Sequence, residues 1–314
     1  MKTDEIYRAL CMRTSPENIA VDEPMSRHTT FHIGGPADYF VTPQTADELA
    51  AVIAYCKEAH LPHVIIGNGS NLLVDDAGVR GVVIQLFRKM QSCRVEGTRI
   101  RAGAGALLSA AAQAARDASL TGMEFAAGIP GTLGGAVMMN AGAYGGEMKD
   151  ILCFVDVLDE SGAVREIPVE DLALGYRTSA VKQNGWIVLG AVMQLEEGDV
   201  ASIDARMAEL REARTSKQPL QYPSAGSTFK RPEGHFAGKL IMDAGLAGYT
   251  IGGAQVSEKH CGFVINRGNA TARDVCALIA EVRRRVIDAY GVVLEPEVKF
   301  LGAFEGEEIY GERL

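Results

Sequence analysis

The sequence predicts a protein of mixed helices and strands with several folded regions, of which the first has an α/β pattern, and three observations support this class. A chain of 314 residues is long enough for two or three domains and a full hydrophobic core. Its hydrophobic fraction of 47% and charged fraction of 23% are typical of globular proteins. Predicted helices and strands alternate over residues 1–88, strands dominate residues 89–200, and both types recur over residues 201–302. We therefore expect three domains with these boundaries and a C-terminal tail over residues 303–314.

In the first region, Thr45-Ala-Asp-Glu48 is a capping box that predicts the start of a helix. The apolar residues that follow share one helical face; they are Leu49, Val52, Ile53 and Cys56. After Pro62, residues 63–66 have the composition of a buried strand, and further strands are expected at 72–74 and 82–84.

The middle region contains two predicted hairpins. Residues 94–96 and 99–102 flank Gly97-Thr98, and residues 151–158 and 164–169 flank Ser161-Gly162. Between the hairpins lies an alanine-rich helix, and after them one more strand is expected. The helix spans residues 107–118 and the strand spans residues 186–195.

Two amphipathic helices are predicted in the last region. The first covers residues 200–215, with Ile203, Met207 and Leu210 facing inward. The second begins after Asn269-Ala-Thr271, ends before Gly291 and follows a strand at 262–265. Its apolar stripe consists of Val275, Leu278, Ile279, Val282 and Val286.

Charge and cysteine usage limit the possible classes of function. The net charge of −9 argues against non-specific nucleic-acid binding, and the basic run at 283–285 is best interpreted as the solvated face of a helix. The N-terminal sequence MKTDEIYRAL resembles neither a secretory signal nor a membrane anchor. The six cysteines are scattered without a C-x-x-C pair, which is typical of reduced thiols. We expect a cytoplasmic protein that binds neither membranes nor nucleic acid.

Two glycine-rich segments are candidates for a cofactor site. Residues 128–146 read GIPGTLGGAVMMNAGAYGG, with seven glycines in nineteen residues, so a bulky ligand can lie against the backbone. Residues 67–71, Gly-Asn-Gly-Ser-Asn, follow a predicted buried strand, where backbone N–H groups can form a nest for a pyrophosphate. A plain tight turn is the alternative for the second segment. Together the two segments favour one long ligand.

Residues 223–231, Pro-Ser-Ala-Gly-Ser-Thr-Phe-Lys-Arg, combine a hydroxyl with nearby cations. Ser227 follows a glycine, and Lys230 and Arg231 come shortly after it. This arrangement can donate a proton beside a carboxylate or phosphate. A glycine-rich cofactor segment followed by such a group indicates a redox enzyme.

Other motifs are incomplete or missing. Gly103-Ala-Gly105 resembles the start of a dinucleotide fingerprint, but Leu108 occupies the position of the third glycine. No Walker A sequence and no H-E-x-x-H sequence occur. The pair His260-Cys261 lacks partners at ligand spacing, so we expect no metal site.

Five motifs in order resemble the UDP-N-acetylenolpyruvoylglucosamine reductase family. They are GNGSNLLV (67–74), AGIPGTLGGAVMMNAGAYGGE (127–147), LGYRTSAVK (174–182), AGSTFKRPEG (225–234) and LEPEVKFLG (294–302). The resemblance covers the chain from about residue 29 to residue 302. The short connection between Lys182 and Lys217 is similar to the shorter form of the family, which lacks a tyrosine-bearing insertion. Arg231 stands where one form of the family has asparagine.

The resemblance implies a vanillyl-alcohol-oxidase (PCMH-type) FAD-binding fold. Residues 1–88 and 89–200 would be its two subdomains, and residues 201–302 would form an α+β substrate-binding domain. The family's catalytic arginine, proton-donating serine and glutamate fall on Arg177, Ser227 and Glu297. Taken alone, Arg177 and Glu297 have the pattern of ordinary surface charges.

Binding residues are expected in the same motifs. Those proposed for FAD are Gly67, Asn68, Gly69, Ser70, Asn71, Gly128, Gly131, Gly134, Gly135, Asn140 and Gly142. Those proposed for the substrate are Tyr176, Lys217, Lys230, Arg231 and His260.

The activity implied by the resemblance is reduction of the enolpyruvyl group of UDP-N-acetylglucosamine enolpyruvate, which gives UDP-N-acetylmuramate for peptidoglycan. NADPH would reduce non-covalently bound FAD in a separate half-reaction, and the enzyme would be a monomer. Two alternatives remain. Another flavin oxidoreductase of this fold, acting on a hydroxy acid or alcohol, would use oxygen and often a covalent flavin. A nucleotide-sugar binding module would be colourless.

Overall fold

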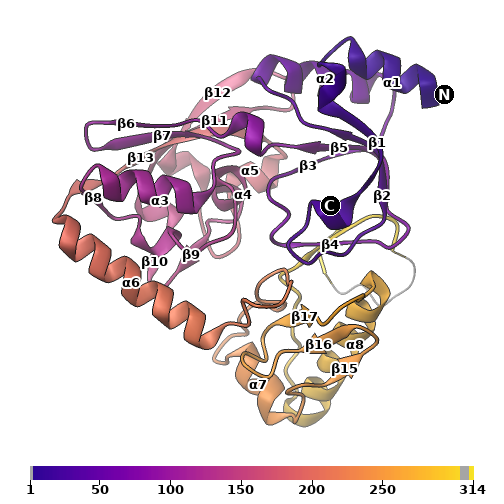
Figure 1. The fold of residues 1–314 in the computed structure, drawn as a ribbon, viewed down its shortest axis with the longest axis vertical. Coiled ribbons are helices and arrows are strands. Elements are labelled where there is room, and N and C mark those ends of the chain that lie inside the picture. Colours follow the sequence, from indigo (N-terminus) through magenta and orange to yellow (C-terminus); the bar gives the residue numbers. More distant parts are fainter. Residues whose placement is uncertain (1–2, 305–310) are drawn as a thin grey trace. The chain divides into compact units, whose positions relative to one another are not determined.

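The computed structural model describes residues 3–304 and 311–314, which form two compact units (Figure 1). One unit consists of Met1–Ala20, Val41–Asn68 and Ile84–Arg214. The other consists of Val21–Phe40, Gly69–Val83 and Thr215–Leu314. Two segments from the first third of the chain therefore join the C-terminal third. The three domains expected from the sequence divide the chain differently, and that division stays a prediction.

The first unit contains a five-stranded antiparallel sheet with the order β12-β11-β13-β7-β6. Both predicted hairpins are confirmed, and their turns contain Gly97 (φ +63°) and Gly162 (φ +85°). Positive φ values are easiest for glycine, so these residues suit the turns. The strands are β6 (Cys93–Glu96), β7 (Arg99–Gly103), β11 (Leu152–Leu158), β12 (Val164–Pro168) and β13 (Ile187–Gln194).

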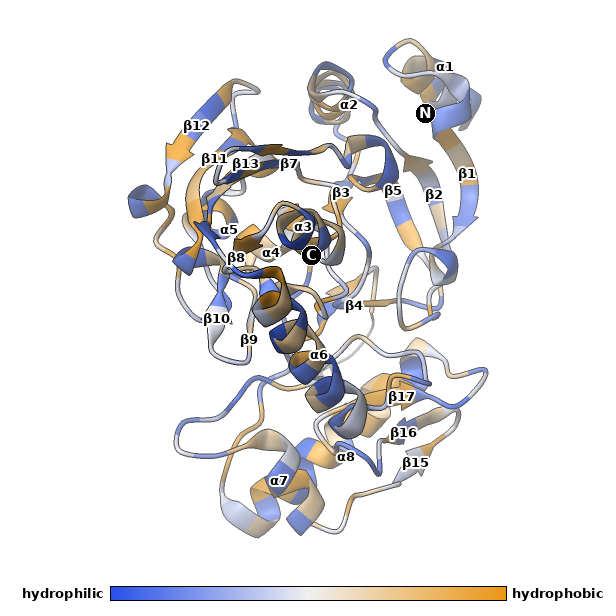
Figure 2. Cartoon of the chain, turned by 60° about the vertical axis from the view of Figure 1, so that its left-hand side comes forward, coloured by the Kyte–Doolittle hydropathy of each residue, from blue (hydrophilic) through white to orange (hydrophobic). Residues whose placement is uncertain are grey.

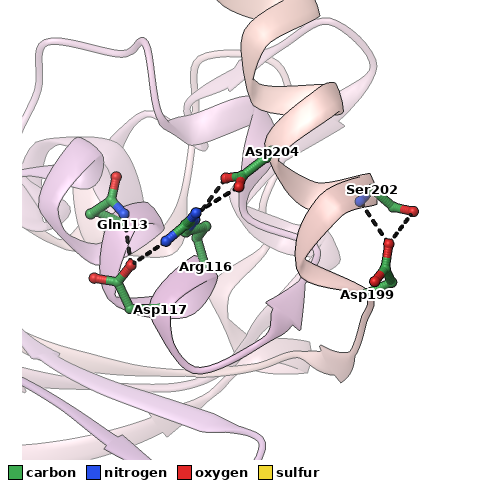
Figure 3. Close-up of polar contacts among 6 residues, drawn as sticks. All are labelled: Gln113, Arg116, Asp117, Asp199, Ser202 and Asp204. Atoms are coloured by element: carbon green, nitrogen blue, oxygen red, sulfur yellow. Dashed lines mark hydrogen bonds and ion pairs between the residues drawn. The ribbon is translucent and has the colours of Figure 1, made fainter.

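Side-chain hydrogen bonds join two helices of this unit and cap the start of one of them. Arg116 of one helix donates two hydrogen bonds to Asp204 of another, at 2.7 and 2.6 Å (Figure 3). Asp199 accepts from the Ser202 N–H at 2.9 Å, which satisfies a free donor at the start of α6. The helices are α1 (Thr3–Cys11), α2 (Ala46–Glu58), α3 (Leu108–Asp117), α4 (Leu133–Met138), α5 (Ala180–Asn184) and α6 (Val200–Lys217).

Helices α2 and α6 match the sequence predictions with two differences. The Thr45 hydroxyl accepts from the Glu48 N–H at 3.1 Å, but the Glu48 carboxylate accepts from Gln44 rather than Thr45. The capping box is therefore only half formed, because Glu48 reaches one residue further back. Most of α6 is hydrophilic (Figure 2), and Met207 is only half-buried, whereas Ile203 and Leu210 are buried as predicted.

Smaller strands complete the topology. A four-stranded sheet has the order β1-β2-β5-β3, and the chain passes from one unit to the other along β1, β2 and β5. Its strands are β1 (Ile19–Pro24), β2 (Pro36–Val41), β3 (His63–Ile66) and β5 (Val79–Gln85). Two short ladders pair β8 (Leu120–Thr121) with β14 (Glu196–Glu197) and β9 (Gly142–Ala143) with β10 (Gly146–Glu147).

The second unit packs a long helix, α8 (Ala272–Tyr290), onto the sheet β15-β16-β17. Thr271 and Asp274 form a capping box, Gly291 ends the helix with φ +68°, and the predicted apolar stripe is buried. The remaining elements are α7 (Ala237–Asp243), β15 (Thr250–Ile251), β16 (Ala254–Val256), β17 (Val264–Asn266), and the parallel pair β4 (Leu72–Val74) and β18 (Lys299–Leu301).

The end of the chain adds to β18. The Leu314 N–H donates to the Phe300 carbonyl at 2.9 Å, and the Phe300 N–H donates to the Glu312 carbonyl at 3.1 Å. Residues 305–310 of the predicted tail lie outside the described residues. Among the helices that the structure describes, none combines the length and apolar character needed to cross a membrane.

Candidate active site

The long glycine-rich segment contains the short helix α4, which is bonded to the loop after β7. Leu133 donates its N–H to the Ala106 carbonyl at 2.8 Å, and Gly134 donates to the Ala104 carbonyl at 2.9 Å. A Cβ on Gly134 would lie 3.2 Å from the Ala104 Cβ, so close packing favours glycine there. A Cβ on Gly135 would meet only the Thr132 hydroxyl, at 3.8 Å, and Gly135 is exposed. Its bare backbone leaves room for a ligand.

The shorter segment, residues 67–71, presents backbone N–H groups. The Gly67 carbonyl accepts from Gln85 Nε2 at 3.0 Å, and the Gly69 carbonyl accepts from the Thr30 N–H at 3.3 Å. In a trans peptide the next N–H points the opposite way. The N–H groups of Asn68 and Ser70 therefore point away from these donors.

The first two residues of the shorter segment, Gly67 and Asn68, meet the long segment within the first unit. Asn68 Nδ2 donates to the Pro130 carbonyl at 2.7 Å, and a Cβ on Gly67 would overlap the Thr132 hydroxyl. The sequence prediction that one ligand could contact both segments is compatible with this contact. The exposed backbone of Gly135 and the N–H group of Asn68 suit a flat ring system joined to a pyrophosphate, so these residues fit FAD.

Arg177 lies at the tip of a tight turn. Gly175 and Thr178 exchange backbone hydrogen bonds of 3.1 and 3.3 Å, which leaves Tyr176 and Arg177 as the two central residues. Arg177 has φ +56°, a left-handed conformation that is uncommon for a residue with a side chain. Its guanidinium lies over the Tyr176 ring, 5.0 Å from the centroid. Such strain is typical of functional positions that their surroundings hold in place.

Side chains hold this turn on both flanks. The Asn140 amide, which is only 1% exposed, donates to the Gly175 carbonyl at 3.3 Å. The buried Ser179 hydroxyl donates to the Met138 carbonyl at 2.7 Å. Both bonds join the turn to the α4 segment, so the first unit brings Arg177's turn to the glycine-rich tract.

Ser227 and Glu297 lie on two adjacent backbone segments of the second unit. The Glu297 N–H donates to the Thr228 carbonyl at 2.8 Å, and Phe229 pairs with Pro296. Asn71 Nδ2 donates to the Glu297 carbonyl at 3.1 Å. Ser227 is exposed and Glu297 is half-buried. The predicted serine and glutamate motifs and the end of the shorter glycine segment are thus brought together.

The cationic residues near Ser227 differ in their contacts. Lys230 forms an ion pair with Glu295 at 3.0 Å, and the Arg231 guanidinium lies 4.1 Å from the centroid of the exposed Phe236 ring. His260 Nδ1 accepts from the Gly262 N–H at 3.1 Å, and burial lowers the pKa of its imidazole. His260 is therefore neutral near pH 7 and offers a hydrogen bond rather than a charge. Lys217 is exposed at the end of α6.

One cation near the glycine-rich tract is not indicated by the sequence. A Cβ on Gly128 would lie 3.1 Å from Arg214 Cδ, so this arginine packs against the tract. Burial lowers the pKa of Arg214, and within the described residues it forms no ion pair with a carboxylate. In the sequence Arg214 is one of many charges on α6, so no pattern distinguishes it. As for metals, no cluster of three or more candidate ligands occurs among the described residues.

Two family models match this chain. The model described as "FAD binding domain" matches residues 37–168, and the model described as "UDP-N-acetylenolpyruvoylglucosamine reductase, C-terminal domain" matches residues 218–301. The UDP-N-acetylenolpyruvoylglucosamine reductase of Lachnoclostridium phytofermentans is 55% identical over 292 residues, which cover 92% of this chain and 94% of that protein. The chain belongs to the UDP-N-acetylenolpyruvoylglucosamine reductase family.

Further relatives extend the match. The reductase of Clostridioides difficile is 51% identical over 302 residues, covering 96% of this chain and 99% of that protein. The solved structure of the reductase from Thermus caldophilus is 39% identical with a TM-score of 0.77, and the match covers 90% of this chain and 98% of that one. These matches confirm the predicted family and the α+β fold with an FAD-binding domain.

Proposed function

We propose that this chain is an NADPH-dependent FAD enzyme that reduces the enolpyruvyl group of UDP-N-acetylglucosamine enolpyruvate. The product is the lactyl ether UDP-N-acetylmuramate, a precursor of peptidoglycan. The observation that carries the proposal is family membership over more than nine-tenths of the chain. The strained Arg177 turn and the adjacent Ser227 and Glu297 segments supply groups suited to this chemistry.

FAD binding is assigned to the two glycine-rich segments. The outward N–H groups of Asn68 and Ser70 would bind the pyrophosphate, and the bare backbone around Gly135 would lie against the ring system. Bound FAD supplies hydride transfer, which no amino-acid side chain can perform. The remaining FAD candidates of the sequence analysis stay proposals, as does the absence of a covalent link.

Arg177 and Glu297 are proposed to act on the carboxylate of the enolpyruvyl group. That carboxylate is anionic, so it polarises the adjacent double bond only weakly. The planar Arg177 guanidinium can donate two parallel hydrogen bonds to it. Glu297 would act as a protonated donor or would orient a water molecule. Both groups would stabilise the negative charge that develops as the double bond is reduced.

Ser227 is proposed to donate the proton that completes the reduction. After hydride addition to the terminal carbon, the carbon beside the carboxylate has enolate character and is basic enough to take a proton from an alcohol. The exposed Ser227 hydroxyl is available for this step, and it follows Gly226, whose φ of +77° suits glycine. The Lys230 ammonium could stabilise the resulting alkoxide. The carboxylate of Glu295, which pairs with Lys230, would partly offset its positive potential there.

Contacts to the uridine diphosphate are assigned to Tyr176, Lys217, Lys230, Arg231 and His260. Lysine and arginine can pair with phosphate oxygens, and neutral His260 can donate one hydrogen bond. A monomeric enzyme in the cytoplasm is part of the proposal.

An anaerobic visible spectrum tests the proposed function. The purified protein should show the absorption band of oxidised flavin. NADPH should bleach this band, and UDP-N-acetylglucosamine enolpyruvate should restore it. A protein that is colourless after reconstitution with FAD, or whose reduced flavin reacts only with oxygen, would contradict the proposal and support one of the alternative classes.

A further inference from the structure

The Asn140 amide connects two parts of the first unit that are distant in sequence. Its Nδ2 donates to Glu147 Oε2 at 2.6 Å and to the Gly175 carbonyl at 3.3 Å, and its Oδ1 accepts from the Lys149 N–H at 2.9 Å. Protein partners thus occupy both the donor and the acceptor of the amide. Such an amide is suited to holding backbone segments together.

The bond to Gly175 has a specific consequence for Arg177. Gly175 is the first residue of the turn whose third residue is Arg177, and Arg177 has φ +56°. A side-chain-bearing residue in this conformation is strained, so the turn needs bonds that hold it. Asn140 supplies one from the Gly175 side, and Ser179 supplies the other.

Other bonds already hold the hairpin of β9 and β10 beside Asn140. Gly142 pairs with Glu147, and the Met148 N–H donates to the Ala141 carbonyl at 3.0 Å. The hairpin therefore does not depend on Asn140 alone. The bond from Asn140 to Gly175, by contrast, is a direct link between the hairpin and the turn.

We infer that Asn140 is a positioning residue for Arg177, in addition to any contact it makes with the cofactor. This inference rests on the proposed function, in which Arg177 binds the substrate carboxylate. A displacement of about 1 Å in such a group can cost on the order of 100-fold in rate. The loss of the Gly175 bond should therefore slow reaction with the enolpyruvyl substrate much more than it slows flavin reduction by NADPH.

Exchanging the donor and acceptor roles of residues 140 and 147 separates the positioning of Arg177 from the stability of the β9–β10 hairpin. Asn140→Asp removes the donor to Glu147 and to Gly175 and places two carboxylates together. Adding Glu147→Gln restores a donor between positions 140 and 147, but not the bond to Gly175. The double variant should recover FAD content and thermal stability, yet flavin reoxidation by the enolpyruvyl substrate should remain about 10- to 100-fold slow. Recovery of the wild-type reoxidation rate in the double variant would overturn the inference.

Two further measurements complete the test. In an Arg177→Ala background, Asn140→Asp/Glu147→Gln should slow reoxidation little further, because the group it positions is gone; full additivity would contradict the inference. Asn18→Asp is the control, since Asn18 is also buried (2% exposed) and its amide donates to Thr14 at 2.9 Å elsewhere in the unit. It should alter stability but neither half-reaction.

If wild-type protein does not reduce the substrate, the proposed function fails. If wild-type protein does reduce it, and the Asn140 variants reoxidise their flavin at the wild-type rate, only this inference fails.

Discussion

The two units hold their candidate catalytic groups in different ways. In the second unit, Ser227 and Glu297 lie on adjacent segments that are joined by backbone bonds such as Glu297 N–H to Thr228 carbonyl, 2.8 Å. In the first unit, Arg177 lies in a turn with a left-handed φ of +56°, and side chains from Asn140 and Ser179 bond to its flanks. Backbone pairing tolerates substitution of neighbouring side chains, whereas the backbone bonds between Gly175 and Thr178 are supplemented by particular side chains on both flanks of the turn.

This difference predicts where distant substitutions matter. The position of Ser227 and Glu297 should be less sensitive to changes in nearby side chains, because backbone bonds join their segments; Asn71, whose amide donates to the Glu297 carbonyl at 3.1 Å, is the exception. The position of Arg177 should respond to changes at residues that never contact substrate. The following substitutions test the comparison.

The largest effect is expected from Ser227→Ala. Loss of a positioned proton donor typically costs about 10²–10⁴-fold, so reoxidation of the flavin by the enolpyruvyl substrate should slow by that amount. Reduction by NADPH should keep nearly its normal rate, because it requires no proton at carbon. Stopped-flow absorbance of each half-reaction measures both, and Ser227→Cys should give an intermediate rate. Equal slowing of both halves would instead indicate structural damage.

Arg177→Ala and Glu297→Ala should each retain FAD and lower turnover by about 10²-fold or more, because both groups act where charge develops. Arg177→Lys should rescue poorly, since a point charge cannot reproduce a planar pair of donors. Steady-state kinetics together with the flavin-to-protein absorbance ratio measure these outcomes. A nearly wild-type rate for Arg177→Lys would refute the two-bond contact with the carboxylate.

A smaller effect isolates the strain at position 177. Arg177→Gly and Arg177→Ala both remove the guanidinium, but only glycine adopts φ +56° without cost. The glycine variant should therefore be more stable than the alanine variant by about 1 kcal/mol in urea unfolding. Equal stability would mean that the turn is not strained.

The smallest effect is expected for the exposed ion pair of Arg116 and Asp204 (Figure 3). The hydrogen bonds from Arg116 lower the pKa of the Asp204 carboxyl. Any stability that the ion pair adds to the folded protein is therefore fully present at pH values above the ordinary pKa of an aspartate. It is lost as the pH falls through the lowered pKa. A double-mutant cycle with Arg116→Ala and Asp204→Ala should show a weak coupling that disappears in high salt. A coupling that persists in salt would contradict a solvent-screened pair.

Local signals predicted much of the fold. Gly97, Gly162 and the Asn269-Ala-Thr271 start of the long helix predict hairpins and a helix start through short-range geometry, and the sequence shows them directly. Helix α4 was not predicted, because glycines disfavour helices. It forms through contacts with Ala104 and Ala106, which only the folded chain provides.

The residues of the candidate site could be predicted from the sequence, but the contacts that hold them in place could not. Five ordered motifs identified Arg177, Ser227 and Glu297 through family resemblance, and their roles stay predictions. Nothing in the sequence pairs Asn140 with Gly175, since 35 residues separate them and no periodicity connects them. Likewise, the positive φ of Arg177 has no sequence signal, because arginine is not a residue that usually marks such a turn.

Product analysis under anaerobic conditions tests the account most directly. With NADPH and UDP-N-acetylglucosamine enolpyruvate, mass spectrometry should show one molecule of UDP-N-acetylmuramate, two mass units heavier than the substrate, for each NADPH oxidised. Oxidation of NADPH without this product, or only when oxygen is admitted, would contradict the account.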